Sequence, residues 1–131
     1  MNFLIDTNIL IYRLKNMGNV NDNFLKYQNE PMSVSVVSYG ELVYGAEKSK
    51  SVEKNLKTIS EIKGIFPLTD ITADVMEVFG KIKAYVQKIG KSSDDMDLLI
   101  AATAIANEMT LVTHNVKHFE HIPNLKLTDW F

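Results

Sequence analysis

Short apolar runs alternate with amphipathic segments along this chain, and this alternation constrains the fold more than any other feature. The candidate strands are mostly apolar and cover residues 2–5, 32–37, 66–68, 111–113 and 126–127. Helical periodicity and capping residues predict helices over residues 7–15, 20–28, 38–46, 52–64, 72–89 and 94–108. Alternation of this kind is typical of βαβ units with right-handed crossovers. We therefore expect an α/β fold with a central, mostly parallel twisted sheet that helices cover on both faces.

The length and composition fit one folded domain. With 131 residues, of which 46% are hydrophobic and 23% charged, the chain can bury one core but not two. We therefore expect a single domain over residues 1–131. The absence of cysteine excludes disulfides, thiolate metal sites and a cysteine nucleophile. The chain has no signal-peptide pattern and no apolar run of the roughly 18 residues that span a membrane, so we expect a cytoplasmic protein.

Acidic and amide side chains follow several of the predicted strands. Asp6 comes directly after the first apolar run, Glu41 follows the second, and Asn115 follows the fourth. Asp97 lies in the first turn of the last predicted helix. Because ligands of parallel α/β sheets bind beyond the carboxyl ends of the strands, we expect these side chains to share one cleft.

Carboxylates that share a cleft repel each other and therefore require a cation or a proton. At about 5 Å and an effective dielectric constant of roughly 20, each pair costs about 3 kcal/mol. Oxygen ligands without cysteine or an obvious histidine set favour Mg²⁺ or Mn²⁺ over zinc. Such clusters occur in enzymes that hydrolyse phosphodiesters, where a second carboxylate orients or deprotonates the attacking water. The sequence therefore predicts a metal-dependent phosphodiester hydrolase with Asp6, Glu41 and Asp97 as its candidate acids.

Some of these residues also have a purely structural interpretation. Asp6 can be the N-cap of the first helix, and Glu41 can pair with Ser38 in a capping box. Asn8 and Asn115 fit turn or cap positions, although either can orient a water molecule.

The acids near residue 97 lie at a helix N-terminus, where the macrodipole stabilises any negative charge. Asp97 precedes an almost continuous apolar segment, which indicates a buried helix where an unpaired charge is costly. Asp94 lies three residues earlier on the same face and is a candidate fourth acid. We expect Asp95 to point to solvent.

The three histidines, and the two tyrosines near Glu41 in the sequence, are not predicted to take part in the chemistry. His114, His118 and His121 are expected on an exposed surface near the mouth of the cleft. Tyr39 and Tyr44 flank Glu41, and packing is the simpler role for each, although Tyr44 can also stack on a base.

The lysines are grouped, even though the formal net charge is -2. One group consists of Lys48, Lys50, Lys54, Lys57 and Lys63, and the other of Lys81, Lys83, Lys88 and Lys91. Each group is either a solvated helix face or a surface that contacts phosphates.

Four sequence segments occur in an informative order. They are FLIDTNILIY, SVVSYGELVYGAEKS, SSDDMDLLIAATAIA and LVTHNVKHFEHI, followed by LKLTDW. Together they resemble the PIN-domain ribonuclease toxins of the VapC type. The resemblance implies a three-layer α/β/α fold and Mg²⁺-dependent endonucleolytic cleavage of RNA, often tRNA or rRNA. It also implies a homodimer and a VapB-type antitoxin whose C-terminal segment puts a basic side chain into the acidic site.

Carried onto this sequence, the resemblance places the catalytic acids at Asp6, Glu41 and Asp97, with Asp6 and Asp97 as the usual magnesium ligands. Thr7 and Thr113 match small polar residues that line the site. The lysine groups would then contact RNA phosphates on either side of the acidic centre.

The chain departs from the family pattern in two places. Many members have another acid where this chain has Asn115, so a fourth carboxylate is either absent or supplied by Asp94 or Glu120. The SSDDMD stretch also lacks the Pro and Gly that are frequent before the third acid.

Two other functions compete with a nuclease. The first is a PIN-like module that binds RNA or a protein without cleaving, which has no evident reason to keep clustered charges. The second is a phosphate-accepting signalling domain, which is disfavoured because no nucleophilic aspartate with a following lysine can be identified.

Overall fold

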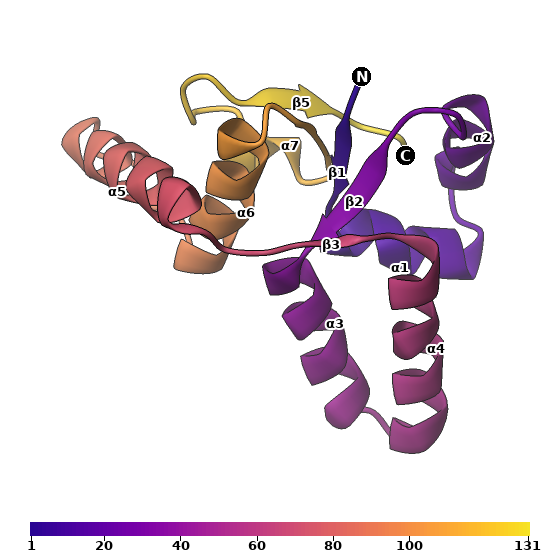
Figure 1. Cartoon of the computed structure of the whole chain (residues 1–131). Coiled ribbons are helices and arrows are strands. Elements are labelled where there is room, and N and C mark those ends of the chain that lie inside the picture. The colour runs from indigo at the N-terminus through magenta and orange to yellow at the C-terminus, as the bar shows by residue number, and fades with distance from the viewer.

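The fold is a five-stranded sheet with seven helices, described over residues 1–131 by a computed structural model (Figure 1). The strands are β1 (Phe3–Ile5), β2 (Met32–Ser35), β3 (Leu68–Thr69), β4 (Thr110–Val112) and β5 (Lys126–Thr128). The helices are α1 (Thr7–Lys15), α2 (Val20–Lys26), α3 (Val36–Glu47), α4 (Val52–Ile65), α5 (Ala73–Lys88), α6 (Asp95–Ala106) and α7 (Val116–Phe119).

The strand order in the sheet is β3-β2-β1-β4-β5, and every neighbouring pair is parallel. The central strand β1 pairs on both sides, with Phe3 opposite Met32 of β2 and Thr110 of β4. Since all strands run the same way, their carboxyl ends lie at one edge of the sheet. The parallel α/β fold predicted from the sequence is confirmed.

Helices cover both faces of the sheet, and side chains of β1 alternate between two cores. Phe3 and Ile5 pack into one core with residues of α1, α2 and α4. Leu4 points the other way and packs with residues of α5 and α6. Figure 1 shows these two sets of helices on opposite sides of the strands. None of the helices combines the length and the apolar character that a membrane span requires.

Helix α3 begins earlier than predicted, and this changes the role of Glu41. Its N-cap is Ser35, whose hydroxyl accepts a hydrogen bond from the Ser38 backbone N–H at 3.0 Å. The capping box of Ser38 with Glu41 is therefore wrong, because Glu41 lies in the second turn. Val36 and Val37 favour strands, but here the Ser35 cap and the burial of Val37 override that preference.

Candidate active site

Asp6 lies at the carboxyl end of the central strand, where β1 turns into α1. Its backbone N–H donates to the Val112 carbonyl at 2.9 Å and so extends the pairing with β4. One carboxylate oxygen accepts from the Thr7 backbone N–H and the other from the Thr113 hydroxyl, both at 2.8 Å. Only 5% of Asp6 is exposed. The residue is thus both the N-cap of α1 and a buried carboxylate whose two oxygens each accept one hydrogen bond.

Burial raises the pKa of Asp6 from 3.8 to about 6. The hydrogen bonds from Thr113 and Thr7 lower this pKa, whereas the negative charges of Asp97 and Glu41 raise it further. Asp97 and Glu41 are therefore each close enough to Asp6 to act on its carboxylate electrostatically. A cation at this position would relieve both the desolvation of Asp6 and the repulsion among the acids.

Glu41 reaches the same place from α3. Its Oε1 accepts a hydrogen bond from the Thr7 hydroxyl at 2.9 Å. Thr7 thereby joins two acids, since its N–H donates to Asp6 and its hydroxyl donates to Glu41. This link between residues 34 positions apart holds the first turn of α1 against the second turn of α3.

Asp97 enters from the first turn of α6, where its side chain remains 25% exposed. Burial raises the pKa of Asp97, Asp94 raises it further, and His118 lowers it. The Nδ1 atom of His118 lies 3.5 Å from Asp97 Oδ2. His118 is exposed, as predicted, but it was not expected to contact an acid of the site. In the sequence, the only feature that could have indicated this contact is the position of His118 three residues after Asn115, on the short helix α7.

The other candidate residues lie around this centre. Asp94 is the N-cap of α6 and accepts from the Met96 backbone N–H at 2.9 Å. Asp95 points away and pairs with Lys83 at 3.0 Å, which agrees with the expected solvent position. Glu120 is the exposed C-cap of α7 and has no hydrogen bond or ion pair with the three acids. Of the two candidates for a fourth acid, only Asp94 therefore influences Asp97.

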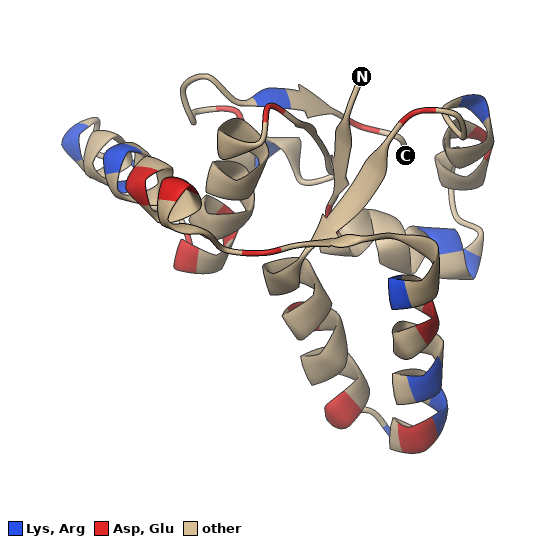
Figure 2. Cartoon of the chain, viewed as in Figure 1, with Lys and Arg blue, Asp and Glu red and all other residues tan.

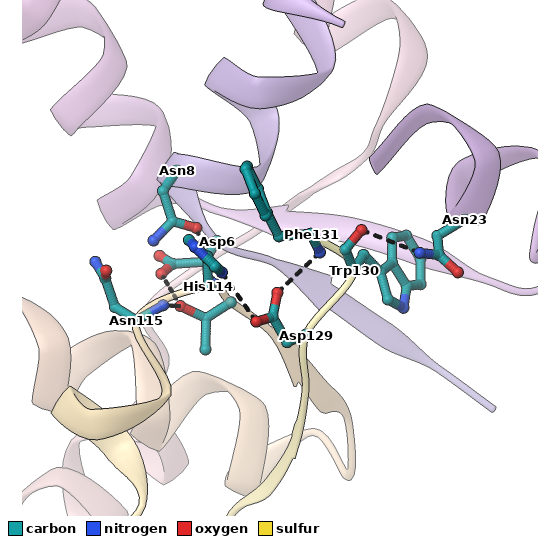
Figure 3. A network of polar contacts seen from close by, with 9 residues as sticks. Asp6, Asn8, Asn23, His114, Asn115, Asp129, Trp130 and Phe131 are labelled. Atoms are coloured by element: carbon teal, nitrogen blue, oxygen red, sulfur yellow. Dashed lines mark hydrogen bonds and ion pairs between the residues drawn. The ribbon is translucent and has the colours of Figure 1, made fainter. Parts of the chain in front are cut away.

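The turn after β4 is held by the C-terminal segment (Figure 3). Thr113 Oγ1, which donates to Asp6, accepts from the Asn115 backbone N–H at 3.1 Å. The His114 backbone N–H donates to Asn8 Oδ1 at 3.3 Å. The His114 ring pairs with Asp129 at 2.9 Å and stacks on Phe131 with ring centroids 4.2 Å apart. These contacts fix the backbone that presents Thr113 to Asp6.

The carboxylate oxygens of the site fit a hard cation that keeps several waters better than a metal ion that is held by many protein ligands. No three acidic or histidine side chains converge closely enough to ligate one ion together. Mg²⁺ commonly takes one or two carboxylates and keeps several waters, which suits Asp6 and Asp97. A buried carboxylate with a raised pKa, near two further acids, is the arrangement that such an ion stabilises.

Acids gathered near Asp6 at the carboxyl edge of a parallel, helix-covered sheet define an α/β domain with an acidic site at that edge. The family model of the PIN domain matches residues 3–125. The chain is 33% identical over 132 residues to ribonuclease VapC2 of Rickettsia felis, covering 99% of this chain and 98% of that protein. It is 34% identical over 131 residues to the tRNA(fMet)-specific endonuclease VapC of Shigella flexneri, with the same coverage.

Solved structures show the same relationship. The crystal structure of Rickettsia felis VapBC2 bound to a promoter DNA fragment matches with a TM-score of 0.93, 32% identity and full coverage of both chains. DNA-bound VapBC from Salmonella typhimurium matches with a TM-score of 0.92 and 30% identity, over 100% of this chain and 99% of that chain. The chain therefore belongs to the PIN-domain family, in the group of the VapC ribonucleases.

Proposed function

We propose that this chain is a Mg²⁺-dependent endoribonuclease and the toxin of a type II toxin–antitoxin pair. The observation that carries the proposal is the buried Asp6 carboxylate, whose pKa is raised to about 6 by burial, with Asp97 and Glu41 close by. A desolvated acid beside two others destabilises the fold unless a cation neutralises its charge. The presence of Asp6 at this buried position is therefore best explained by function.

Each residue of the site has a separate role in the proposed phosphodiester hydrolysis. Asp6 and Asp97 would hold the cation, which can also be Mn²⁺. When bound, the cation supplies positive charge that stabilises the transition state at phosphorus. Glu41 orients or deprotonates the attacking water. The Thr7 hydroxyl fixes the position of the Glu41 carboxylate. Thr113 keeps Asp6 in its orientation through the 2.8 Å hydrogen bond.

A structured RNA is the proposed substrate, with tRNA ahead of rRNA. One relative is named a tRNA(fMet)-specific endonuclease, which supports tRNA as the first substrate to test. The lysine groups support an RNA surface, because one group lies on α4 and on the turn before it and the other lies on α5 and just after it (Figure 2).

The proposed partner is a VapB-type antitoxin, supported by similar structures that are VapBC complexes. A basic side chain of such a partner can form charge-assisted hydrogen bonds with the acids and so block the cation. A homodimer, a cytoplasmic location and a single domain over residues 1–131 complete the proposal.

The test is cleavage of a total tRNA pool by the purified protein with Mg²⁺, with Mn²⁺ and with EDTA. Discrete fragments that need a cation, and that disappear in Asp97→Asn, are expected. The Asp97→Asn protein is purified in the same way and controls for contaminating ribonucleases. If wild-type protein binds RNA but never cleaves it, a non-catalytic RNA-binding module is the better description.

A further inference from the structure

Helix α3 contains a glycine in its interior that packing does not explain. Gly40 is exposed, and a Cβ atom added there would meet no atom within 4 Å. Glycine in a helix interior is less stable than alanine, so a structural reason would normally be a close neighbour. Gly40 is one of the residues that line a groove beside Glu41, and a large side chain at this position would project into that open space.

This groove lies between α3 and α6. The groove has a volume of about 490 Å³, which lies within the roughly 300–1,000 Å³ of small-molecule sites. Its walls are mainly apolar, and Glu41 is the only charged residue among them. Gly40 and Tyr44 line it from α3, and Met96 and Leu99 line it from α6.

Tyr44 contributes a largely exposed aromatic ring, whose one charged neighbour is Lys48. The packing role expected for Tyr44 is wrong, since 65% of the residue is exposed, whereas Tyr39 does pack against the core. The Lys48 ammonium lies 4.8 Å from the centre of the Tyr44 ring and forms no ion pair. The groove therefore offers an aromatic ring and a candidate catalytic acid, and the Lys48 cation lies beside that ring, outside the groove lining.

We propose that this groove is the subsite for one unpaired nucleobase of the RNA substrate, stacked on Tyr44. The inference rests on the proposed ribonuclease function and names how that site holds its substrate. Aromatic side chains stack on any base, and Lys48 would neutralise a neighbouring phosphate. Because Glu41 lines the groove, the bound base would lie next to the phosphodiester that is hydrolysed at the acidic site. The apolar walls provide few hydrogen-bonding groups, so this subsite accepts all bases with little selectivity.

The test measures binding in EDTA, where no cleavage occurs, by fluorescence anisotropy. The probes are labelled octauridylate and an abasic octamer of ribose phosphate with the same charge. We expect Tyr44→Ala to weaken octauridylate binding by about tenfold and to leave the abasic probe unchanged. Tyr44→Phe keeps the stacking face and should bind like the wild type.

A second pair of variants tests the groove without touching the tyrosine. Gly40→Leu projects a side chain into the open space and should weaken octauridylate in the same way as Tyr44→Ala. Gly40→Ala adds one methyl group that contacts nothing and should bind nearly normally. Circular dichroism and thermal unfolding of all four variants establish that they are folded.

Three results would overturn the subsite. Equal weakening of both probes would show that bases are not recognised, and unchanged binding in Tyr44→Ala and Gly40→Leu would show that the groove is not used. A lower sedimentation mass in Tyr44→Ala without a base-specific binding loss would show that a second copy covers the groove. If base-specific binding through Tyr44 persists but wild type cleaves no RNA with any cation, the proposed function fails while the subsite stands.

Discussion

Replacing the buried acid Asp6 by asparagine should stabilise the metal-free protein at neutral pH. Burial raises the pKa of Asp6 from 3.8 to about 6, so the folded state holds this proton more tightly than the unfolded chain. Below pH 3.8 the group is protonated in both states and costs nothing. The tighter binding of this proton stabilises the folded state at low pH. This contribution is lost as pH rises through about 6, because the folded protein must then bury the charged carboxylate.

The expected gain follows from that shift. At about 1.4 kcal/mol per pKa unit, the raised pKa of Asp6 costs the folded state about 3 kcal/mol at pH 7.5, where the group is ionised, and about 1 kcal/mol at pH 4.5, where only the unfolded chain is largely ionised. Asparagine keeps an acceptor for the Thr7 N–H but loses the acceptor of the Thr113 hydroxyl, which costs about 1 kcal/mol at any pH. The variant should therefore gain about 2 kcal/mol at pH 7.5 and about nothing at pH 4.5.

The assay is urea unfolding of wild type and Asp6→Asn in EDTA at both pH values, with slopes compared to establish a common unfolded state. Asp22→Asn, which changes an exposed acid on α2, is the matched control. If the difference in unfolding free energy between Asp6→Asn and wild type stays the same from pH 4.5 to 7.5, the reasoning about Asp6 is refuted.

Three further predictions concern the other groups of the site. Glu41→Gln should lower kcat for RNA cleavage by about 100-fold or more while leaving cation binding nearly intact; an unchanged kcat would remove Glu41 from the chemistry. His118→Ala should raise the pKa of Asp97, since His118 now lowers it, and so shift the acidic limb of the cleavage profile to higher pH. An unshifted limb would mean that Asp97 does not control that limb. An arginine-containing peptide with the sequence of a VapB C-terminus should inhibit the wild type and bind Asp6→Asn more weakly; equal binding would place the peptide outside the acidic cleft.

The fold could be predicted because the central strands lie in short, mostly apolar runs and the helices show apolar residues at helical spacing. Leu4 lies between Phe3 and Ile5, and the three residues alternate between two cores as a buried parallel strand requires. The start of α3 could not be predicted, because Val36 and Val37 favour strands and only tertiary packing places them in a helix.

The site was predictable only as far as its position relative to the strands. Asp6 follows β1 directly, so its place at the carboxyl edge is a consequence of the topology. The hydrogen bond from Thr7 to Glu41 depends on how α1 packs beside α3, and no local sequence pattern predicts that packing. The contact of His118 with Asp97 and the exposure of Tyr44 likewise arise from long-range packing.

The central claim is that Asp6 and Asp97 together hold the cation that the ribonuclease needs. Mn²⁺ binding, followed by electron paramagnetic resonance of the free ion, tests this claim directly in wild type, Asp6→Asn and Asp97→Asn. Loss of a partner outside the ligand shell already costs about tenfold in affinity, so each variant should bind Mn²⁺ at least that much more weakly. Wild-type affinity in both variants would show that the cation binds elsewhere and would contradict the account.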